Sequence, residues 1–353
     1  MGSRITQMSA RLSDPFPLVS ILVPTMNEEN NVGAALAAIA ANHYPVARLQ
    51  VVVVDGGSHD QTLSVVGSFS DQLPLKVIVE KGCTVYRALN LGLANASGDV
   101  VLRVDARSQI PENYIRTCVA HLSRGDIKGV GGVQEQYGLN STGEAIAIAT
   151  AHPLGVGGAA FRVGRRSGFV DTVYLGCYPR DVFEEIGQFD DDGRVVSEDS
   201  MFNKRLRDKG GKIFLDHTLR VKYPAKTSIA ALVRQYFIYG GARAHVWLKY
   251  GVLTSKRQLI PILFSLGLIA MALVGLWHRP ALLALFVGLG VYGVTVLVAS
   301  LLALYMKGRL ILLGKLMLAF GAIHFAWPAG FFLRIITPSV YFRLLSAPRQ
   351  GDD

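Results

Sequence analysis

Residues 19–32, VSILVPTMNEENNV, and residues 51–62, VVVVDGGSHDQT, decide the fold of this chain. Each stretch begins with an apolar run and then turns polar at Asn, Asp or Gly. Such a run indicates a strand that is buried on both faces. Residues 28–42, between the two runs, are predicted as a helix that the sequence His-Tyr-Pro ends. Strand, helix, strand is the repeating unit of a parallel sheet covered by helices.

The same alternation continues along the chain. Residues 75–80 and 99–106 are predicted strands, and residues 85–96 are a predicted helix between them. A glycine-rich stretch follows at 129–169, and residues 182–216 are predicted as helix, loop, helix and strand.

The polar residues that follow these strands indicate a ligand site. Ligands of a parallel sheet bind beyond the carboxyl ends of its strands. Asn27, Asp55 and Asp105 each lie at the end of a predicted strand or just past it. We therefore expect all three at one edge of the sheet.

Four motifs in one order give the chain a family resemblance. They are Val-Pro-x-x-Asn-Glu at 23–28, Asp-Gly-Gly-Ser-x-Asp at 55–60, RALNLGLANASGD at 87–99 and EDSMFNKRLRDKG at 198–210. With these motifs the chain resembles the inverting family 2 glycosyltransferases, which have a GT-A fold, over roughly residues 17–250. The resemblance implies an α/β fold with a Rossmann-like, nucleotide-sugar-binding domain.

Three further stretches narrow the resemblance. They are HPLGVGGAAFR at 152–162, DTVYLGCYPRDVFEEIGQFD at 171–190 and RQYFIYG at 234–240, followed by an apolar tail. These are similar to the membrane-attached glycosyltransferases of succinoglycan-type exopolysaccharide biosynthesis.

The resemblance implies a nucleotide-sugar donor, with UDP as the expected nucleotide. The family uses the aspartate at the position of Asp55 to accept a hydrogen bond from a uracil N–H, although an ordinary Asp-Gly turn is an alternative interpretation. Gly57 would let the backbone approach the nucleotide. Arg87 could reach the diphosphate or could belong to a solvated helix surface. The predicted donor-binding residues are Pro24, Asn27, Glu28, Asp55, Gly57, Arg87, Asp105 and Arg107.

The metal site that the resemblance implies is altered. Asp105 stands at the first position of Asp-x-Asp, but Arg107 stands at the third. Mg²⁺ or Mn²⁺ could bind through Asp105, the diphosphate and water, because Mg²⁺ often keeps waters and uses phosphate ligands. Alternatively, Arg107 could supply the positive charge itself. We prefer a retained metal; His217 could add a ligand, but a lone histidine is more often structural.

The catalytic base is predicted at the start of a helix. The resemblance makes Asp199 the general base for the acceptor hydroxyl, with Glu198 beside it. The alternative interpretation is structural, because Ser197 is a good N-cap and carboxylates are favoured in the first turn of a helix.

Residues 157–169, GGAAFRVGRRSGF, carry three arginines on a glycine-rich loop. The loop is either a mobile surface segment or a flap that holds the phosphate of a lipid acceptor. In the second interpretation, the acceptor-binding residues there are Arg162, Arg165 and Arg166.

The stretch RQYFIYG occupies the position of Gln-x-x-Arg-Trp in processive polysaccharide synthases. Gln235 and Tyr239 fit its outer positions and are predicted to bind the acceptor, but Ile238 replaces the arginine. The loss of that arginine argues against processive synthesis.

The C-terminal part of the chain predicts a membrane protein. Residues 217–353 contain 15 Lys and Arg against 2 Asp and Glu, so an anionic partner is expected. Apolar runs favour a lipid bilayer over nucleic acid. We expect spanning helices at about 259–277, 281–306 and 310–336, the last kinked or re-entrant at Pro328.

The predicted organisation follows from these segments. Basic residues near 249–257 and 307–315 place the N-terminal domain in the cytoplasm by the positive-inside rule, so the chain is predicted to be a multi-pass cell-membrane protein. The three cysteines are scattered, so no disulfide framework is expected. The predicted regions are a flexible N-terminus at 1–16, a catalytic domain at 17–222, an amphipathic interface helix region at 223–257, a transmembrane region at 258–345 and a tail at 346–353.

Together these features predict a membrane-bound inverting glycosyltransferase. It would transfer one sugar to a polyprenyl-diphosphate-linked saccharide. Transfer to polyprenyl phosphate is an alternative. A non-catalytic or lipid-translocating protein is a third possibility, which rests on Arg107 alone and is opposed by the complete set Asp55, Asp105 and Asp199.

Overall fold

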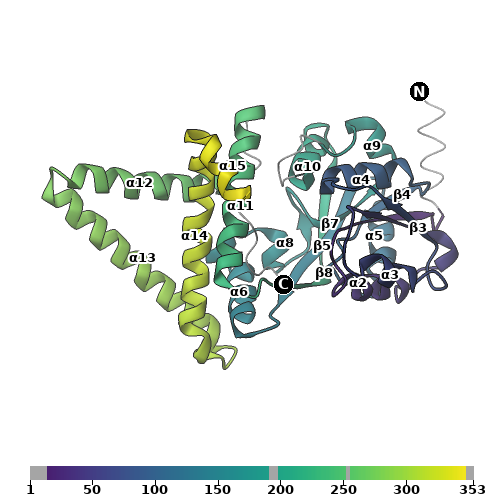
Figure 1. Cartoon of the computed structure of the whole chain (residues 1–353), viewed down its shortest axis with the longest axis horizontal. Coiled ribbons are helices and arrows are strands. Elements are labelled where there is room, and N and C mark those ends of the chain that lie inside the picture. Colours follow the sequence, from purple (N-terminus) through teal and green to yellow (C-terminus); the bar gives the residue numbers. More distant parts are fainter. Residues whose placement is uncertain (1–13, 191–197, 252–254, 347–353) are drawn as a thin grey trace. The chain divides into compact units, whose positions relative to one another are not determined.

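The computed structural model describes residues 14–190, 198–251 and 255–346. The chain divides into two compact units (Figure 1). Of the described residues, the N-terminal unit comprises 14–135, 160–190 and 198–223, and the C-terminal unit comprises 136–159, 224–251 and 255–346. A single boundary at residue 222 therefore does not describe this division, because residues 136–159 group with the C-terminal helices.

An eight-stranded sheet forms the centre of the N-terminal unit, in the order β3-β2-β1-β4-β7-β5-β8-β6. Strands β1, β2, β3 and β4 run parallel, as the sequence predicts. Strand β7 then pairs antiparallel with β4 and with β5. The strands are β1 (Val19–Thr25), β2 (Leu49–Asp55), β3 (Leu75–Val79), β4 (Val100–Arg103), β5 (Ile127–Tyr137), β6 (Gly168–Phe169), β7 (Tyr174–Pro179) and β8 (Lys212–Pro224).

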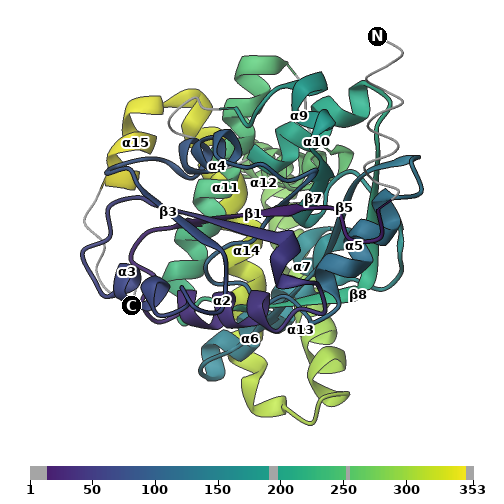
Figure 2. The same cartoon turned by 90° about the vertical axis from the view of Figure 1, so that its right-hand side faces the viewer.

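Helices cover both faces of this sheet (Figure 2). Alternate residues of β2 point to opposite faces of the sheet. Val51 and Val53 belong to the buried cluster that includes α2, α3 and α5. Val52 and Val54 belong to the cluster that includes α4, α9 and α10. Burial on both faces explains why the central strands are continuously apolar. The helices are α2 (Val32–Ala40), α3 (Thr62–Gly67), α4 (Val85–Ala94), α5 (Tyr114–Leu122), α8 (Ala160–Val163), α9 (Asp181–Ile186) and α10 (Glu198–Asp208).

Phe16, at the end of the segment predicted as a flexible N-terminus, packs its ring against Tyr44 at 5.5 Å between centroids. The flexibility of residues 1–16 stays a prediction. Residues 1–13 lie outside the described residues.

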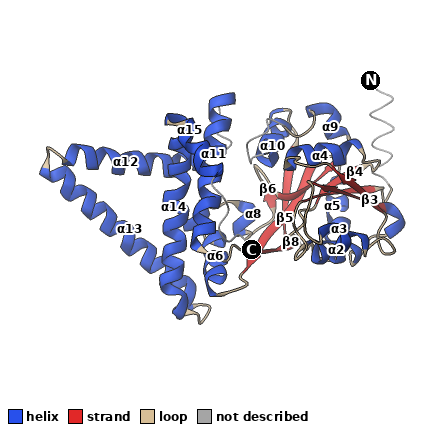
Figure 3. Cartoon of the chain, in the orientation of Figure 1, coloured by secondary structure: helices blue, strands red, loops and turns tan. Residues whose placement is uncertain are grey.

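The C-terminal unit is built almost entirely of helices (Figure 3). They are α6 (Ser141–Ala151), α7 (Pro153–Val156), α11 (Ile229–Tyr250), α12 (Leu259–Gly275), α13 (Arg279–Tyr305), α14 (Leu313–Ile336) and α15 (Pro338–Ser346). Helix α6 joins the core of this unit, where its alanines and isoleucines pack with residues of α11 and α14.

Helices α11 and α14 are in close backbone contact. A Cβ atom on Gly240 would collide with the carbonyl oxygen of Trp327, and one on Gly330 would collide with that of Phe237. Leu232 and Tyr236 of α11 are buried in the same cluster as Phe320 of α14. The apolar face that predicted an interfacial helix at 223–257 is thus largely covered by protein, because α14 packs on it.

Among the described residues, two segments are long and apolar enough to cross a membrane by length and composition, namely Arg279–Tyr305 and Leu310–Ile336. They match the second and third predicted spans. Helix α12, the first predicted span, has 17 residues and is shorter than these two. Pro328 lies inside the single helix α14, so the chain does not turn back there.

Candidate active site

The loops after β1 and β2 are joined at the carboxyl edge of the sheet. Asn27 has a left-handed φ of 52°, its N–H donates to Ser58 Oγ at 2.8 Å, and its side-chain oxygen accepts from the N–H of His59 at 2.9 Å. The N–H of Glu28 donates to Thr62 Oγ1 at 2.7 Å. Pro24 lies in β1 opposite Val54 of β2, beyond the last residue that β1 pairs with β4.

Asp55 is fully buried and organises the second of these loops. Its Oδ1 accepts from the N–H groups of Gly57 at 2.9 Å and Ser58 at 2.7 Å, and its Oδ2 accepts from Ser58 Oγ at 2.5 Å. Gly57 has a φ of 94°, a conformation that favours glycine. The structure therefore gives Asp55 a loop-shaping role, and its predicted contact with a uracil stays a prediction.

Arg107 reaches back to the first loop. Its Nε donates to both carboxylate oxygens of Glu28, at 2.7 and 2.9 Å, and Asn31 Nδ2 donates to Glu28 Oε2 at 2.9 Å. The Glu28 side chain is 13% exposed and that of Arg107 is 38% exposed. The arginine at the third position of the motif thus forms an ion pair with another predicted donor-binding residue.

A single guanidinium joins the two carboxylates that are most important for the predicted chemistry. Arg103 Nε donates to Asp105 Oδ1 at 2.6 Å, and Arg103 Nη1 donates to Asp199 Oδ1 at 2.6 Å. Arg103 is the last residue of β4, which ends before Asp105, and its side chain is 11% exposed. The bridge brings together residues 96 positions apart in sequence.

Buried hydroxyl groups support Asp105. Tyr174 Oη donates to Asp105 Oδ2 at 3.3 Å and lies 2.7 Å from Ser108 Oγ. Burial, and after it the negative charge of Asp105, raises the pKa of the Tyr174 hydroxyl well above its ordinary value. Tyr174 therefore stays protonated and available as a hydrogen-bond donor.

A second buried network fixes the helix that carries Asp199. Asn203, one turn further along α10, is fully buried. It accepts from Tyr178 Oη at 2.8 Å and donates to Thr172 Oγ1 at 2.9 Å. Ser197 and the side chain of Glu198 lie outside the described residues, so the predicted cap and the predicted role of Glu198 stay predictions.

Four further predicted site residues of the N-terminal unit are arginines, and their contacts differ. Arg87 pairs with Glu80 at 2.5 Å and is 56% exposed. Arg162 lies over the ring of Phe161, with its guanidinium carbon 5.5 Å from the centroid. Arg165 and Arg166 are exposed, and no carboxylate among the described residues is paired with either.

His217 does not join a metal-binding group in the described part of the chain, where no cluster of three or more His, Cys, Asp or Glu residues is suited to hold an ion. Its Nδ1 lies 2.8 Å from Ser167 Oγ, which also accepts from the His217 N–H at 3.0 Å. Ser167 thus holds one of the two ring nitrogens of His217, and the role of His217 as a metal ligand stays a prediction.

Gln235 and Tyr239 belong to the C-terminal unit. Gln235 Nε2 donates to Tyr239 Oη at 3.0 Å, as their spacing on one helix face predicts. Their role in acceptor binding stays a prediction.

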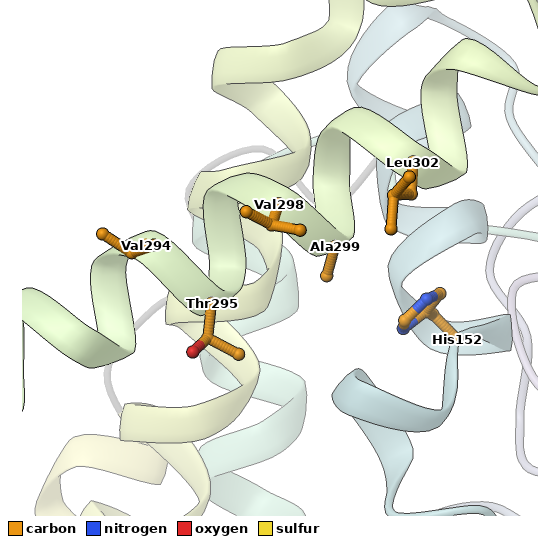
Figure 4. A pocket seen from close by; sticks show the side chains of 6 residues that line it. All are labelled: His152, Val294, Thr295, Val298, Ala299 and Leu302. Atoms are coloured by element: carbon orange, nitrogen blue, oxygen red, sulfur yellow. The ribbon is translucent and has the colours of Figure 1, made fainter.

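The C-terminal unit also has a pocket of about 430 Å³ (Figure 4). His152 faces one side of α13 across it. The lining residues are His152, Val294, Thr295, Val298, Ala299 and Leu302. None of the predicted site residues lines this pocket.

Known proteins resemble the chain in sequence and in fold. Residues 20–187 match the family described as "Glycosyl transferase family 2". The succinoglycan biosynthesis protein ExoA of Rhizobium meliloti is 26% identical over 334 residues, which cover 90% of this chain and 94% of that protein.

A second relative comes from Methanococcus voltae. It is a dolichyl N-acetyl-alpha-D-glucosaminyl phosphate 3-beta-D-2,3-diacetamido-2,3-dideoxy-beta-D-glucuronosyltransferase, 26% identical over 64% of this chain and 72% of its own length. Among solved structures, the mannosyltransferase PcManGT from Pyrobaculum calidifontis, in complex with GDP-Man and Mn²⁺, matches with a TM-score of 0.58. It is 21% identical, and the match covers 95% of both chains.

The mixed sheet has the GT-A fold. The chain is accordingly a glycosyltransferase, and its residues 20–187 relate it to family 2. Its relatives include a protein of succinoglycan biosynthesis.

Sequence reasoning missed Arg103. A signal was present, because Arg103 is a charged residue between Leu102 and Val104, both of which are fully buried. A charge at such a position needs a partner, and carboxylates are the expected partners.

Proposed function

We propose that this chain is a membrane-bound, inverting glycosyltransferase that transfers a single sugar. The donor would be a nucleotide sugar, with UDP as the expected nucleotide, and the acceptor a polyprenyl-diphosphate-linked saccharide. The observation that carries the proposal is the Asp105–Arg103–Asp199 bridge at the edge where the parallel strands end. The bridge supports it because a donor-side carboxylate and a candidate base lie within reach of one side chain.

In the proposed reaction, Asp199 takes the proton of the acceptor hydroxyl. The hydroxyl oxygen bonds to the anomeric carbon of the donor sugar. The bond from that carbon to the nucleoside diphosphate breaks, and the diphosphate leaves with the bonding electrons. A single displacement from the opposite side inverts the anomeric centre.

The donor would bind against the joined loops after β1 and β2. Asn27, Asp55 and Gly57 shape these loops, and Glu28 holds Arg107 beside them. Arg107 would then offset the charge that builds on the departing diphosphate, an interaction that matters most in the transition state. Arg87, now paired with Glu80, would have to leave that partner to reach the donor.

A divalent cation, Mg²⁺ or Mn²⁺, is compatible with this donor set. Asp105 offers carboxylate oxygens, which such ions prefer, but its Oδ1 is bonded by Arg103 and Arg107 replaces the second acid. The set suits an ion that keeps its waters and takes further ligands from the diphosphate. When bound, the ion would neutralise charge on the leaving group. The Mn²⁺ in the mannosyltransferase complex supports this part of the proposal.

The acceptor class is inferred from relatives and from the arginine loop. The names of the two relatives refer to succinoglycan and to a dolichyl-linked sugar phosphate. Arg165 and Arg166, exposed and without a carboxylate partner among the described residues, could bind the phosphate of such a lipid. We also assign Arg162, Gln235 and Tyr239 to acceptor binding.

The same loop supports a second candidate, transfer to polyprenyl phosphate itself. A relative from Pseudomonas fluorescens, 30% identical over 48% of this chain, is named as an undecaprenyl-phosphate transferase. In that reaction the arginines would bind a monophosphate that attacks the donor directly.

For the cellular location, we infer a multi-pass cell-membrane protein with the catalytic unit in the cytoplasm. The apolar segments Arg279–Tyr305 and Leu310–Ile336 support membrane association. With α12 as a further span, Lys249 before it and Lys307 and Arg309 after α13 lie on the same side, which the positive-inside rule makes cytoplasmic.

The proposal is tested by a donor screen on the purified full chain, with and without EDTA. UDP-glucose, UDP-galactose, UDP-N-acetylglucosamine and GDP-mannose are each offered with undecaprenyl phosphate or with an undecaprenyl-diphosphate-linked sugar. Product formed only on the diphosphate-linked acceptor supports the first candidate, and product on the monophosphate supports the second. If no donor is turned over with either acceptor, the proposed function is wrong. Loss of activity in EDTA that Mn²⁺ restores would support the metal.

A further inference from the structure

The guanidinium of Arg103 lies between two carboxylates, and its backbone is held in the sheet. Its backbone lies in β4, opposite Leu22 of β1 in the parallel ladder. Leu102 and Val104 on either side are fully buried, so the main chain at this position has little freedom. The anchored backbone therefore limits where the two donor atoms of this side chain, Nε and Nη1, can point.

Asp199 is fixed from two directions. Asn203 sets the register of α10 through its bonds to Tyr178 and Thr172 in the buried core. Arg103 sets the side chain of Asp199 through a 2.6 Å bond to Oδ1. The first contact places the helix, and the second orients the carboxylate.

From this geometry we propose that Arg103 is the positioning residue of the reaction. It orients the carboxylate of Asp199 toward the acceptor hydroxyl and ties it to Asp105, so that base and donor keep a fixed separation. A cation between them also offsets the repulsion of two neighbouring carboxylates. This inference rests on the proposed function, in which Asp199 is the base.

An ion bridge could instead serve only to hold α10 against the sheet. The two roles predict different results. A positioning residue acts through Asp199, so its removal should lower kcat and leave donor binding in place. If the bridge is purely structural, its removal should lower the stability of the protein and affect donor binding and turnover together.

The test compares Arg103→Ala, Arg103→Lys and Asp199→Asn in the full chain. We expect Arg103→Ala to lower kcat by about 10²-fold, the effect of a misplaced reacting group, with the affinity for UDP unchanged by calorimetry. Arg103→Lys, which keeps the charge but loses the fork, should be intermediate. Added ethylguanidinium should restore part of the Arg103→Ala activity.

The control is Arg205→Ala. Arg205 lies on the same helix as Asp199 but bonds to Asp190 and to the carbonyl of Gln188. Its removal should leave kcat unchanged and should show no rescue by ethylguanidinium. Rescue confined to the Arg103 variant would separate a local guanidinium role from a general effect of the additive.

A double variant completes the test. In the Asp199→Asn background, Arg103→Ala should lower kcat little further, because the two residues act as one unit. Equal loss in both backgrounds without rescue, or a fully active Arg103→Ala, would overturn the inference. If Asp199→Asn alone keeps full transfer, the proposed base is wrong instead, and that result is visible without any Arg103 variant.

Discussion

The side chain of Glu28 is only 13% exposed, and it accepts two hydrogen bonds from Arg107 and a third from Asn31. An arginine can therefore stand at the third position of the motif because a nearby acid holds it. The pair fixes the Arg107 guanidinium next to the loop where we propose the diphosphate binds.

We expect Arg107→Ala to destabilise the protein by about 1–3 kcal/mol, because it removes charged hydrogen bonds from a mostly buried carboxylate. It should also lower kcat more than it weakens donor binding. Adding Glu28→Gln should recover part of the lost stability but none of the lost turnover. Thermal unfolding and steady-state transfer assays measure the two effects. Recovery of both would leave Arg107 a structural role only.

At Asp199, the change to Asn keeps the size and removes the proton acceptor. We expect transfer to fall by about 10²–10⁴-fold, the usual contribution of a general base, while UDP still binds. The measurement is single-turnover transfer with saturating donor. A rate lowered less than about tenfold would be inconsistent with the base role.

Asp216, in β8, gives a prediction about pH. Burial alone would raise its pKa, but hydrogen bonds from His121 at 2.9 Å and from Thr218 outweigh burial and hold the pKa below its ordinary value. A lowered pKa in the folded state stabilises the protein above the ordinary carboxyl value of about 4, and this contribution disappears as the pH falls through the folded-state pKa.

Asp216→Asn should therefore destabilise the protein at neutral pH, by about 1–3 kcal/mol for lost charged hydrogen bonds. The difference from the unmodified protein should shrink as the pH falls below about 4. Unfolding curves in detergent at several pH values measure it. A difference that is constant across this range would mean that the charge of Asp216 does not contribute.

Among the elements, the first four strands could be predicted because each is a mostly apolar run followed by polar residues. Strands β5 and β7 could not. β5 contains Gly129, Gly131 and Gly132, which make it look like a loop in sequence. These glycines are required by close neighbours: a Cβ on Gly129 would lie 2.9 Å from the ring of Tyr178, and one on Gly132 would collide with the carbonyl of Leu219.

Some features of the candidate site could likewise be predicted from the sequence, and others could not. Asn27, Asp55 and Asp105 could be assigned to one edge, because parallel strands end together. The partners of each acid could not be assigned. Tyr174 reaches Asp105 over 69 residues of sequence and Arg103 reaches Asp199 over 96, and no local spacing encodes such contacts.

The contact between α11 and α14 gives a prediction at the level of helices. Gly240→Ala should destabilise the C-terminal unit, because its Cβ would collide with the carbonyl of Trp327 rather than with a movable side chain. Small residues allow such backbone approach between membrane helices.

Gly321→Ala, on α14 itself, is the matched control, since nothing lies within 4 Å of its Cβ position. It should be neutral or stabilising by up to about 1 kcal/mol, the helix penalty of glycine. Unfolding in mild detergent compares the two. Equal stability of both variants would contradict the close contact.

For the whole molecule, the order of the units along the chain matters more than the predicted boundary at 222. Residues 136–159 leave the N-terminal unit, contribute to the C-terminal one, and the chain then returns. Ile146 and Ile148 of α6 are buried with residues from α11 and α14. The C-terminal helices are thus needed to cover a segment that lies within the catalytic sequence.

A chain ending at Tyr223 is therefore expected to be insoluble without detergent, because α6 loses the partners that bury its apolar residues. The full chain, in contrast, should stay with membranes through high-salt washing, since apolar spans do not depend on charge. Replacing Ile146 and Ile148 by Ser in the shortened chain should restore solubility and UDP binding, measured by size-exclusion chromatography and calorimetry. A shortened chain that is soluble and monodisperse without these changes would show that α6 does not require the C-terminal helices.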